Sequence, residues 1–518
     1  MSNSSHVERA LKSAKNIAAS GLKWVSHQPL LLLVFAVALI RLAMLGSYPL
    51  MDTTEARYGD IGRMMAVQND WITPWIRPGI PFWAKPPLSF WSTALSIKVF
   101  GVNEFATRFP SWLLGIITGV MVWDMAVRRS YREAVIAISL LTGCLIFYFA
   151  SGAVMTDMAL TLGIMLSMWG FWFGVHPDQN QALATRGKWL FFVGLGWGLL
   201  AKGPLAPVLI ALSLALWLVL CRQYWPTIRQ LPWFRGLLLT ALIAVPWYWA
   251  AEKKTPGFLD YFLIGEHIKR FLVPGWKGDL YGNAHIHAHG TIWLFLMYMV
   301  APWTILIPLY LWMNRNQISL SAKPLIIEKE SDLKSWRIYL VCWGLMPAIF
   351  FTLASNIIMP YVLPGIPALA LLGGSYLKPI DQRIVDKMLA VGLSIILIGS
   401  LLFIIVFPLT GYGDRKSERS LIRAFQMLKT SDSKLVYLGT HPFSAGFYGN
   451  GDVIDLETVS QLNNYLEKEH HSFIAIPNGI SNSELIQLKQ LQMIQHFRRY
   501  SLYTQAPNLP NPSAHPQG

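Results

Sequence analysis

Long apolar runs alternate with short polar segments along most of this chain. A membrane-crossing helix needs roughly 20 mostly apolar residues, and on that rule the sequence predicts about eleven spans. They lie near residues 30–47, 108–127, 133–151, 156–175, 188–203, 204–221, 234–250, 291–312, 337–354, 359–377 and 388–408. The pattern is typical of a polytopic α-helical membrane protein whose spanning domain occupies residues 29–408.

The two ends of the chain follow different patterns. Residues 1–28 form a polar, basic tail, and the apolar segment after it is too long for a signal peptide, which predicts an uncleaved first span. After Gly411, the segments K-L-V-Y-L-G, D-V-I-D-L and S-F-I-A-I-P alternate with polar helical stretches at 456–469 and 482–493. Strand–helix alternation predicts a small α/β accessory domain over 409–506, and the Pro- and Asn-rich residues 507–518 predict a disordered tail.

Basic residues indicate the orientation of the spans. Lys and Arg concentrate in every second connecting segment, as in Arg128, Arg129 and Arg132 and again in Arg222, Arg229 and Arg235. Under the positive-inside rule these segments and the N-terminal tail are cytoplasmic. Two large loops, 48–107 and 251–290, and the C-terminal domain are then predicted to lie outside.

Composition supports the membrane assignment. The chain is 53% hydrophobic and only 14% charged, whereas a soluble protein carries about a quarter of its residues as charged side chains. The net charge of the chain is +15. In a membrane protein, an excess of basic residues usually lies in the cytoplasmic loops and at contacts with anionic lipids, so it does not indicate nucleic-acid binding. The three cysteines fall in or at the ends of apolar runs without paired spacing, which disfavours disulfides and cysteine–metal sites.

The first external loop combines charges of both signs with tryptophans and prolines. Asp52 and Glu55 stand close to Arg57 and Tyr58, and Lys85 follows in W-A-K-P-P. An acidic residue can deprotonate an acceptor, and a basic residue beside it can hold a phosphate. The alternative is a solvated loop without chemistry.

Further polar residues fall at span ends on the same predicted face. They are Asp157, Lys202, Glu266, His267, Lys269, Arg270, Asn356 and Tyr361. Ionisable residues at membrane depth are costly unless they face a polar cavity. Each one taken alone has a snorkelling or capping explanation, but their common face predicts a shared cavity.

Alternating histidines occur at His285, His287 and His289. On an extended strand they share one face and resemble zinc ligands, but no carboxylate stands at a familiar ligand spacing. We therefore assign no metal to the predicted site and interpret the segment as a polar external loop, with a divalent ion as the minor alternative.

Several motifs carry a resemblance to a known family. They are L-M-D-T-T-E-A-R-Y-G-D-I, P-F-W-A-K-P-P-L-S-F-W, G-V-N-E-F-A-T-R-F-P-S, T-D-M-A-L, A-K-G-P-L-A-P and P-Y-V-L-P-G-I-P. Over residues 30–377 the chain resembles the bacterial polyprenyl-phosphate-dependent glycosyltransferases of the GT-C superfold, family 39. That family includes lipid A aminoarabinose transferases and protein O-mannosyltransferases.

The resemblance implies an inverting enzyme of the bacterial inner membrane with a periplasmic active face. Its donor is a sugar on a polyprenyl (undecaprenyl) phosphate, and its acceptor is lipid A or another lipopolysaccharide component, or, alternatively, a protein hydroxyl. Lys85, Arg270 and Tyr361 match the residues that hold the donor phosphate, and Asp157 and Lys202 match further cavity positions. We predict that Asp157 is catalytic together with Asp52 and Glu55. We predict that the substrate is also bound by Arg57, Tyr58, Glu266 and His267. Thr54 stands where the family commonly has an acidic residue, so the acidic role falls to Asp52 or Glu55.

A transporter or flippase of polyprenyl-linked sugars is the rival class. It predicts charges near mid-span and internal repeats. Apart from Arg41 in the first predicted span, the predicted spans lack charges near their middle, and the sequence shows no repeat. Transfer chemistry is therefore the favoured interpretation.

Overall fold

The computed structural model describes residues 28–176, 180–282, 285–316, 330–354, 356–469, 472–481, 488 and 491–505. The predicted basic tail 1–28, apart from its last residue, the predicted disordered tail 507–518 and most of the predicted helix 482–493 lie outside these residues. The chain divides into two compact units.

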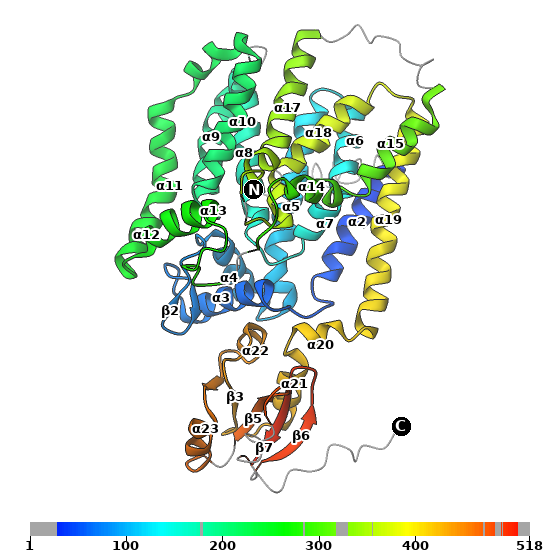
Figure 1. The fold of residues 1–518 in the computed structure, drawn as a ribbon. Helices are drawn as coiled ribbons and strands as arrows, with labels where there is room; N and C mark the ends of the chain where they lie inside the picture. The colour runs from blue at the N-terminus through cyan, green and yellow to red at the C-terminus, as the bar shows by residue number, and fades with distance from the viewer. Residues whose placement is uncertain are drawn as a thin grey trace, which may run out of the picture. The chain divides into compact units, whose positions relative to one another are not determined.

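The first unit contains residues 28–44, Phe82–Ser89 and Phe109–Leu401, and it is helical (Figure 1). Its longer helices are α2 (Pro29–Met44), α5 (Glu104–Val127), α6 (Tyr131–Thr142), α8 (Asp157–Val175), α9 (Gln181–Lys202), α10 (Leu205–Leu220), α11 (Trp233–Lys254), α15 (Trp303–Met313), α17 (Glu330–Phe351), α18 (Ile366–Leu377) and α19 (Gln382–Leu409). The shorter elements are α7 (Leu145–Ala150), η1 (Arg222–Gln230), α12 (Phe258–Asp260), η2 (Tyr261–Lys269), α13 (Arg270–Leu272), α14 (Thr291–Met299) and η3 (Met359–Gly365). Residues of α5 before Phe109 and of α19 after Leu401 belong to the second unit.

Helices α8 and α9 pack closely because glycines line their contact. A Cβ atom on Gly170 would come within 2.4 Å of the Phe191 nitrogen, and one on Gly194 within 2.5 Å of the Ser167 nitrogen. Small residues let two backbones approach where lipid provides no hydrophobic drive for association. Asp157 is the first residue of α8 and Lys202 is the last residue of α9. The close packing of the two helices therefore brings these side chains together.

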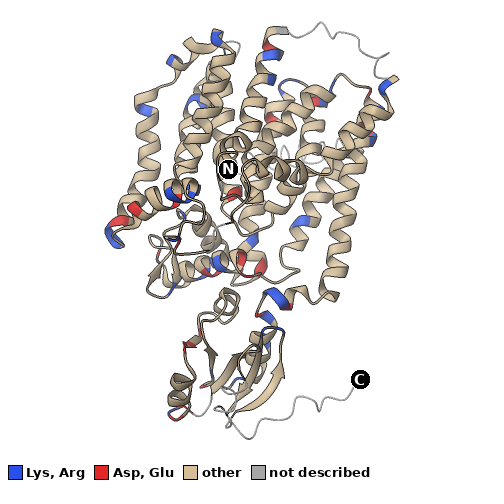
Figure 2. Ribbon diagram, viewed as in Figure 1, with Lys and Arg blue, Asp and Glu red and all other residues tan. Residues whose placement is uncertain are grey.

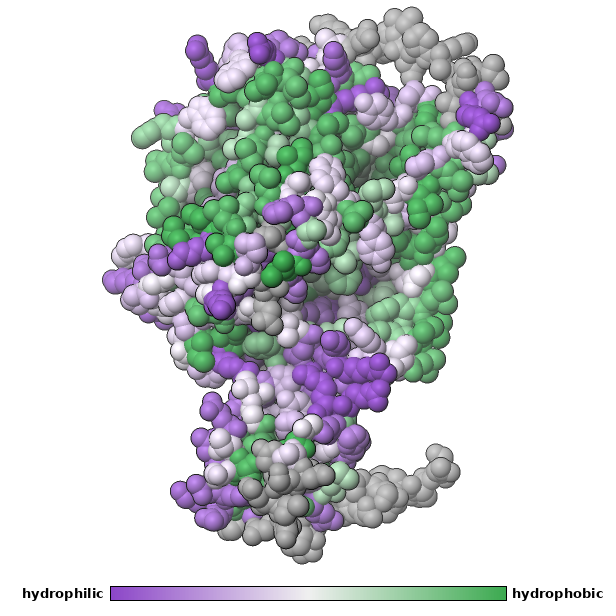
Figure 3. Space-filling view, in the orientation of Figure 1, coloured by the Kyte–Doolittle hydropathy of each residue, from purple (hydrophilic) through white to green (hydrophobic). Residues whose placement is uncertain are grey.

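Apolar side chains cover the outside of the first unit. Figure 3 shows a broad hydrophobic surface over its helices, and Figure 2 shows charged residues mainly at the helix ends. Phe35, Phe234 and Leu242 are all exposed. A surface of this kind suits contact with lipid.

Among the described residues, five helices are long and apolar enough to cross a membrane, or six if a bent pair counts as one span. They correspond to the predicted spans at 108–127, 156–175, 234–250, 359–377 and 388–408, and the pair α14–α15 is bent by 70°. The full count of about eleven remains a prediction.

The predicted span 133–151 is not one helix. It breaks between α6 and α7 at Gly143 and Cys144. There the Leu145 N–H donates to the Ala301 carbonyl, and Trp303 Nε1 donates to the Leu140 carbonyl at 2.7 Å. At the break, backbone groups therefore bond to Ala301, between α14 and α15, and to Trp303, the first residue of α15.

The second unit contains Leu45–Pro81, Phe90–Arg108 and residues 402–505, and its centre is a five-stranded sheet. The strands are β3 (Lys434–Leu438), β4 (Val453–Leu456), β5 (Ser472–Pro477), β6 (Gln492–His496) and β7 (Tyr500–Thr504), in the order β4-β3-β5-β7-β6. Strand β3 is parallel to β4 and β5, whereas β7 is antiparallel to β5 and β6. The three segments predicted as strands form β3, β4 and β5.

Two apolar cores flank this sheet because alternate side chains of a strand point to opposite faces. Leu435 and Tyr437 pack in one core and Val436 and Leu438 in the other. The helices of this part are α20 (Tyr412–Lys416), α21 (Arg419–Leu428), α22 (Phe443–Tyr448) and α23 (Val459–Leu466).

The first predicted external loop is largely ordered, and most of it belongs to the second unit. It contains α3 (Thr54–Gln68), the short strands β1 (Trp75–Arg77) and β2 (Ile80–Pro81), and α4 (Leu88–Phe100). Helix α3 packs on α22, where a Cβ atom on Gly59 would lie 3.7 Å from the Phe447 ring. The E-A-R-Y-G-D motif is therefore held on a helix and packed against the C-terminal sheet domain.

Candidate functional site

A cavity of about 520 Å³ in the first unit gathers most of the predicted polar residues. Its polar lining consists of Lys85, Lys202, Glu266, His267, Arg270, Asn356 and Tyr361. Its apolar lining includes Leu205, Val208, Leu263, Ile264, Ile268, Phe350 and Phe351. These lining residues include three basic side chains and one carboxylate, so the cavity suits an anion attached to an apolar chain.

Glu266 joins two of the cations. Lys85 Nζ donates to Glu266 Oε1, and Arg270 Nη1 donates to both oxygens of Glu266 at 2.7 and 2.9 Å. Burial by itself would raise the pKa of Glu266, but Lys85 and Arg270 lower it, so the carboxylate stays ionised. Glu266 therefore orients the side chains of Lys85 and Arg270, and both side chains keep further N–H groups that can donate to a ligand.

Lys202 is held by a second carboxylate. Its Nζ donates to Asp157 Oδ1 at 2.6 Å, and it lies 4.8 Å from the centre of the Tyr361 ring. His267 lies close to the Lys202 backbone, with Nε2 3.3 Å from the Lys202 carbonyl oxygen and Nδ1 2.7 Å from the Phe262 carbonyl oxygen. Because burial lowers the pKa of His267, the ring is neutral and donates to one of these carbonyls.

Local backbone geometry positions these side chains. Residues Tyr261–Lys269 form a π-helix, an element that is frequent at functional sites. Gly203 ends α9 with φ +69°, and a Cβ atom there would come within 2.5 Å of the Phe262 ring. Only glycine satisfies both the left-handed conformation and this close approach.

The Lys85 segment is tied to the second large predicted loop. The Trp83 N–H donates to the Tyr281 hydroxyl at 3.1 Å, and Trp83 Nε1 donates to Thr255 Oγ1 at 3.1 Å. Asp279 Oδ2 lies 3.6 Å from Arg270 Nη2. Tyr281, Thr255 and Asp279 carried no functional signal in the sequence besides their place in the loop 251–290.

Comparison with known proteins adds a family context. Residues 29–262 match the family model described as dolichyl-phosphate-mannose-protein mannosyltransferase. Undecaprenyl phosphate-alpha-4-amino-4-deoxy-L-arabinose arabinosyl transferase 1 of Pseudomonas fluorescens (strain Pf0-1) is 30% identical over 68% of this chain and 58% of its own length. The similarly named enzyme of Enterobacter sp. (strain 638) is 28% identical over 67% of this chain and 59% of its own length. The chain thus matches less than two thirds of the length of these curated relatives.

A solved structure matches nearly the whole chain. The crystal structure of ArnT from Cupriavidus metallidurans bound to undecaprenyl phosphate has a TM-score of 0.71 and 18% identity, covering 96% of this chain and 99% of the other. The chain therefore has the fold of that structure, which is the GT-C fold that the sequence motifs predict. The resemblance described from the sequence motifs is confirmed, and so is a helical membrane glycosyltransferase fold.

The remaining predicted site residues of this GT-C protein belong to the second unit. Both oxygens of Asp52 are engaged there. Oδ1 accepts from the Ser444 N–H at 2.9 Å, and Oδ2 accepts from the Ser444 hydroxyl at 2.5 Å and from Arg499 Nη1 at 2.8 Å. These contacts make Asp52 one of the residues that attach the C-terminal domain to the first loop, together with Arg77 and Glu104.

Glu55 is engaged in a bidentate pair. Arg108 Nε donates to Oε1 at 2.8 Å and Nη2 donates to Oε2 at 2.7 Å. Arg108 is fully buried and also donates to the carbonyls of Leu45, Tyr48 and Pro49. Glu55 itself is half-buried.

Arg57 and Tyr58 are adjacent on α3 but have different surroundings. Arg57 lies 5.8 Å from the centre of the Phe443 ring, and the Tyr58 ring meets Phe90 edge-on at 5.4 Å. The cavity thus unites the predicted residues Lys85, Lys202, Glu266, His267, Arg270 and Tyr361, with Asp157 bound to Lys202, whereas Asp52, Glu55, Arg57 and Tyr58 belong to the other unit.

The segment with His285, His287 and His289 contributes to no group of metal ligands among the described residues. In the part of the chain that the structure describes, no three His, Cys, Asp or Glu side chains are arranged to hold a metal ion. The His285 N–H donates to Asn356 Oδ1 at 3.0 Å, and Ile286 pairs with Asn356 as an isolated β-bridge. This segment therefore holds Asn356 at the cavity wall.

Proposed function

We propose that this chain is an inverting membrane glycosyltransferase that moves a sugar from a polyprenyl (undecaprenyl) phosphate donor to lipid A or another lipopolysaccharide component. The names of the arabinosyl transferase relatives support the donor class. The main support for the proposal is the cavity whose lining combines Lys85, Lys202 and Arg270 with apolar side chains.

The three cations have a direct role in the proposed reaction. When the glycosidic bond breaks, the leaving phosphate gains charge, so fixed cations stabilise the transition state more than the ground state. Lys85 and Arg270 are pre-oriented by Glu266, and Lys202 is pre-oriented by Asp157. The Tyr361 hydroxyl supplies a further donor to the phosphate, and the apolar wall takes the isoprenoid chain.

The acidic role depends on the acceptor. A hydroxyl acceptor needs a general base, whereas an acceptor that is already an anion hardly needs one. Both carboxylates are hydrogen-bonded, Asp52 to Ser444 and Arg499 and Glu55 to Arg108. We assign the role to Glu55 in preference to Asp52, because the Glu55 side chain is 17% exposed and the Asp52 side chain only 8%. Arg57 and Tyr58, which follow Glu55 on α3, are assigned to substrate binding. The proposed reaction uses the residues alone and requires no metal.

Topology follows from the charge rule. We propose about eleven spans over residues 29–408, a cytoplasmic N-terminal tail, and an active face on the periplasmic side of the inner membrane. The loops 48–107 and 251–290 and the C-terminal domain 409–506 are then periplasmic.

The decisive experiment combines the purified chain with undecaprenyl phosphate-aminoarabinose and lipid A. Release of undecaprenyl phosphate together with a mass increase of lipid A supports the proposal. Donor that crosses the bilayer intact, without release of undecaprenyl phosphate, identifies a flippase instead.

Transfer to protein hydroxyls is the second candidate. The family model that matches residues 29–262 is named for protein mannosyltransferases, which favours it. A deletion strain in which lipid A mass is unchanged and a glycoprotein stain is lost would select this candidate.

A further inference from the structure

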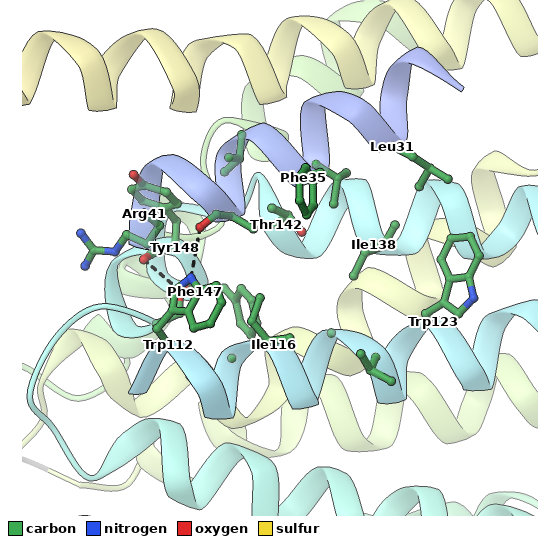
Figure 4. Close-up of a pocket in the computed structure, with 17 residues that line it drawn as sticks. Leu31, Phe35, Arg41, Trp112, Ile116, Trp123, Ile138, Thr142, Phe147 and Tyr148 are labelled. Atoms are coloured by element: carbon green, nitrogen blue, oxygen red, sulfur yellow. Dashed lines mark hydrogen bonds between the residues drawn. The ribbon is translucent and has the colours of Figure 1, made fainter. Parts of the chain in front are cut away.

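A second cavity, of about 510 Å³, lies in the first unit and shares no lining residue with the cation cavity. It is a groove between α2 and α5, closed along one side by α6 and α7 (Figure 4). Its lining from α2 includes Leu31, Val34 and Ala38, and its lining from α5 includes Trp112 and Ile116. The proposed reaction makes no use of it.

The groove has the length of one lipid leaflet. Its lining on α2 runs from Leu31 to Arg41, and ten residues at a rise of 1.5 Å each give about 15 Å. This is half of a hydrocarbon core of about 30 Å. Phe35 and Val120 at its edges are 59% and 61% exposed, so the groove opens on a lipid-facing surface.

One end of the groove carries a buried cation. Figure 4 shows Arg41 and Tyr148 at one end and Leu31 and Trp123 at the other. Arg41 is 4% exposed; its Nη2 donates to the Phe149 carbonyl at 2.8 Å, and its guanidinium lies 5.0 Å from the centre of the Tyr148 ring.

The charge of Arg41 is not neutralised by the described residues. Its Nε has no hydrogen-bond partner, and no carboxylate among the described residues forms an ion pair with it. Room for the guanidinium depends on Gly152, where a Cβ atom would lie 2.2 Å from Nε. A charge at membrane depth without a counter-ion is costly, so the site favours an anionic ligand.

We propose that this groove binds one acyl chain of an anionic glycerophospholipid, and that Arg41 holds the headgroup phosphate. The lipid comes from the leaflet at the Met44 end of α2. A polyprenyl donor chain is much longer than one leaflet, and the cation cavity already suits its phosphate. An acyl chain of a glycerophospholipid matches the length of the groove, and its phosphate matches the single cation, Arg41, at one end.

Native mass spectrometry of the purified full chain tests this site. The probes are phosphatidylglycerol and phosphatidylcholine with the same acyl chains, added at equal concentration. We expect the wild type to retain phosphatidylglycerol roughly tenfold more than phosphatidylcholine, because only the former brings an uncompensated anion to Arg41. Arg41→Met should remove this preference, and Arg41→Lys should retain part of it.

Two further variants distinguish lipid binding in the groove from non-specific lipid binding to the protein surface. Val34→Trp fills the groove and should reduce the tightly bound adduct of both lipids. Arg337→Gln is the matched control, because Arg337 already donates to the side chain and carbonyl of Ser375, and it should leave the preference unchanged.

The outcome that overturns the proposal is equally specific. If Arg41→Met and Arg41→Lys both keep the wild-type preference, or if the wild type shows none, Arg41 does not bind the headgroup. If Arg41→Met instead loses bound undecaprenyl phosphate while phosphatidylglycerol is unaffected, the groove holds the donor and the proposal is wrong. A thermal unfolding curve for each variant confirms that the folded protein is being compared.

Discussion

Lys202 Nζ donates a hydrogen bond to Asp157 Oδ1 at 2.6 Å, and both side chains are buried. We expect Asp157→Leu to lower the free energy of unfolding by about 3–5 kcal/mol, because it leaves the Lys202 charge buried without its partner. The double variant Asp157→Leu/Lys202→Met should recover most of this stability but not turnover. Thermal unfolding followed by tryptophan fluorescence, together with donor consumption, measures both effects. Recovery of turnover in the double variant would show that Lys202 has only a structural role.

Lys85 is predicted to stabilise the leaving phosphate. Lys85→Ala should lower turnover by about a hundredfold, because a charge-assisted contact with the developing phosphate is lost. Lys85→Arg should recover only part of the rate, since a planar fork does not replace a compact ammonium. Lys98→Ala, at an exposed lysine that donates to Asn69, is the control and should keep wild-type turnover. An unimpaired Lys85→Ala enzyme excludes the phosphate role.

Glu55 and Asp52 are predicted to respond differently. If the acceptor is a hydroxyl, Glu55→Gln should lower turnover by about a hundredfold, whereas with an anionic acceptor the loss should be far smaller. Asp52→Asn should mainly weaken the attachment of the C-terminal domain, because Asp52 binds Ser444 and Arg499.

The measurement is turnover per folded molecule with one defined donor. Folded protein must be quantified because Glu55→Gln also weakens the pair with buried Arg108. Limited proteolysis reports the attachment of the C-terminal domain. A larger rate loss in Asp52→Asn than in Glu55→Gln, without increased proteolysis, would reverse the acidic assignment.

Glu418 is predicted to make the stability of the second unit depend on pH. Burial raises the pKa of Glu418 to about 7; Arg499 opposes this rise, whereas Asp52 and Asp414 add to it. Between its ordinary pKa of 4.5 and about 7, the folded protein binds more protons than the unfolded chain. The free energy of unfolding should therefore fall as pH rises through this window, by about 3 kcal/mol in total.

Glu418→Gln is the direct test, because an amide stays neutral at every pH. Its unfolding temperature, measured from pH 5 to pH 8, should vary less than that of the wild type and should be higher above pH 7. Glu457→Gln is the control at an exposed carboxylate. An equal pH dependence in Glu418→Gln and the wild type would contradict the prediction.

The sequence by itself determined that lipid surrounds much of this chain and that polar residues collect at span ends. Apolar runs and basic loop segments are local properties, and burial in lipid depends mainly on such local composition. For the same reason Lys85, Lys202, Arg270 and Tyr361 were predicted as one cluster, and the cavity does unite them. The superfold was recognised from motifs that are likewise read along the chain.

Only the tertiary structure decided which charges meet. Lys85 pairs with Glu266 across 181 positions, and Arg499 pairs with Asp52 across 447. No periodicity encodes such pairs, because an ion pair depends on how separate elements pack and not on the spacing of residues within one element. Asp52 and Glu55 were therefore predicted as alternatives for the acidic role from their neighbours in sequence, and only the structure shows that Asp52 binds Ser444 and Arg499.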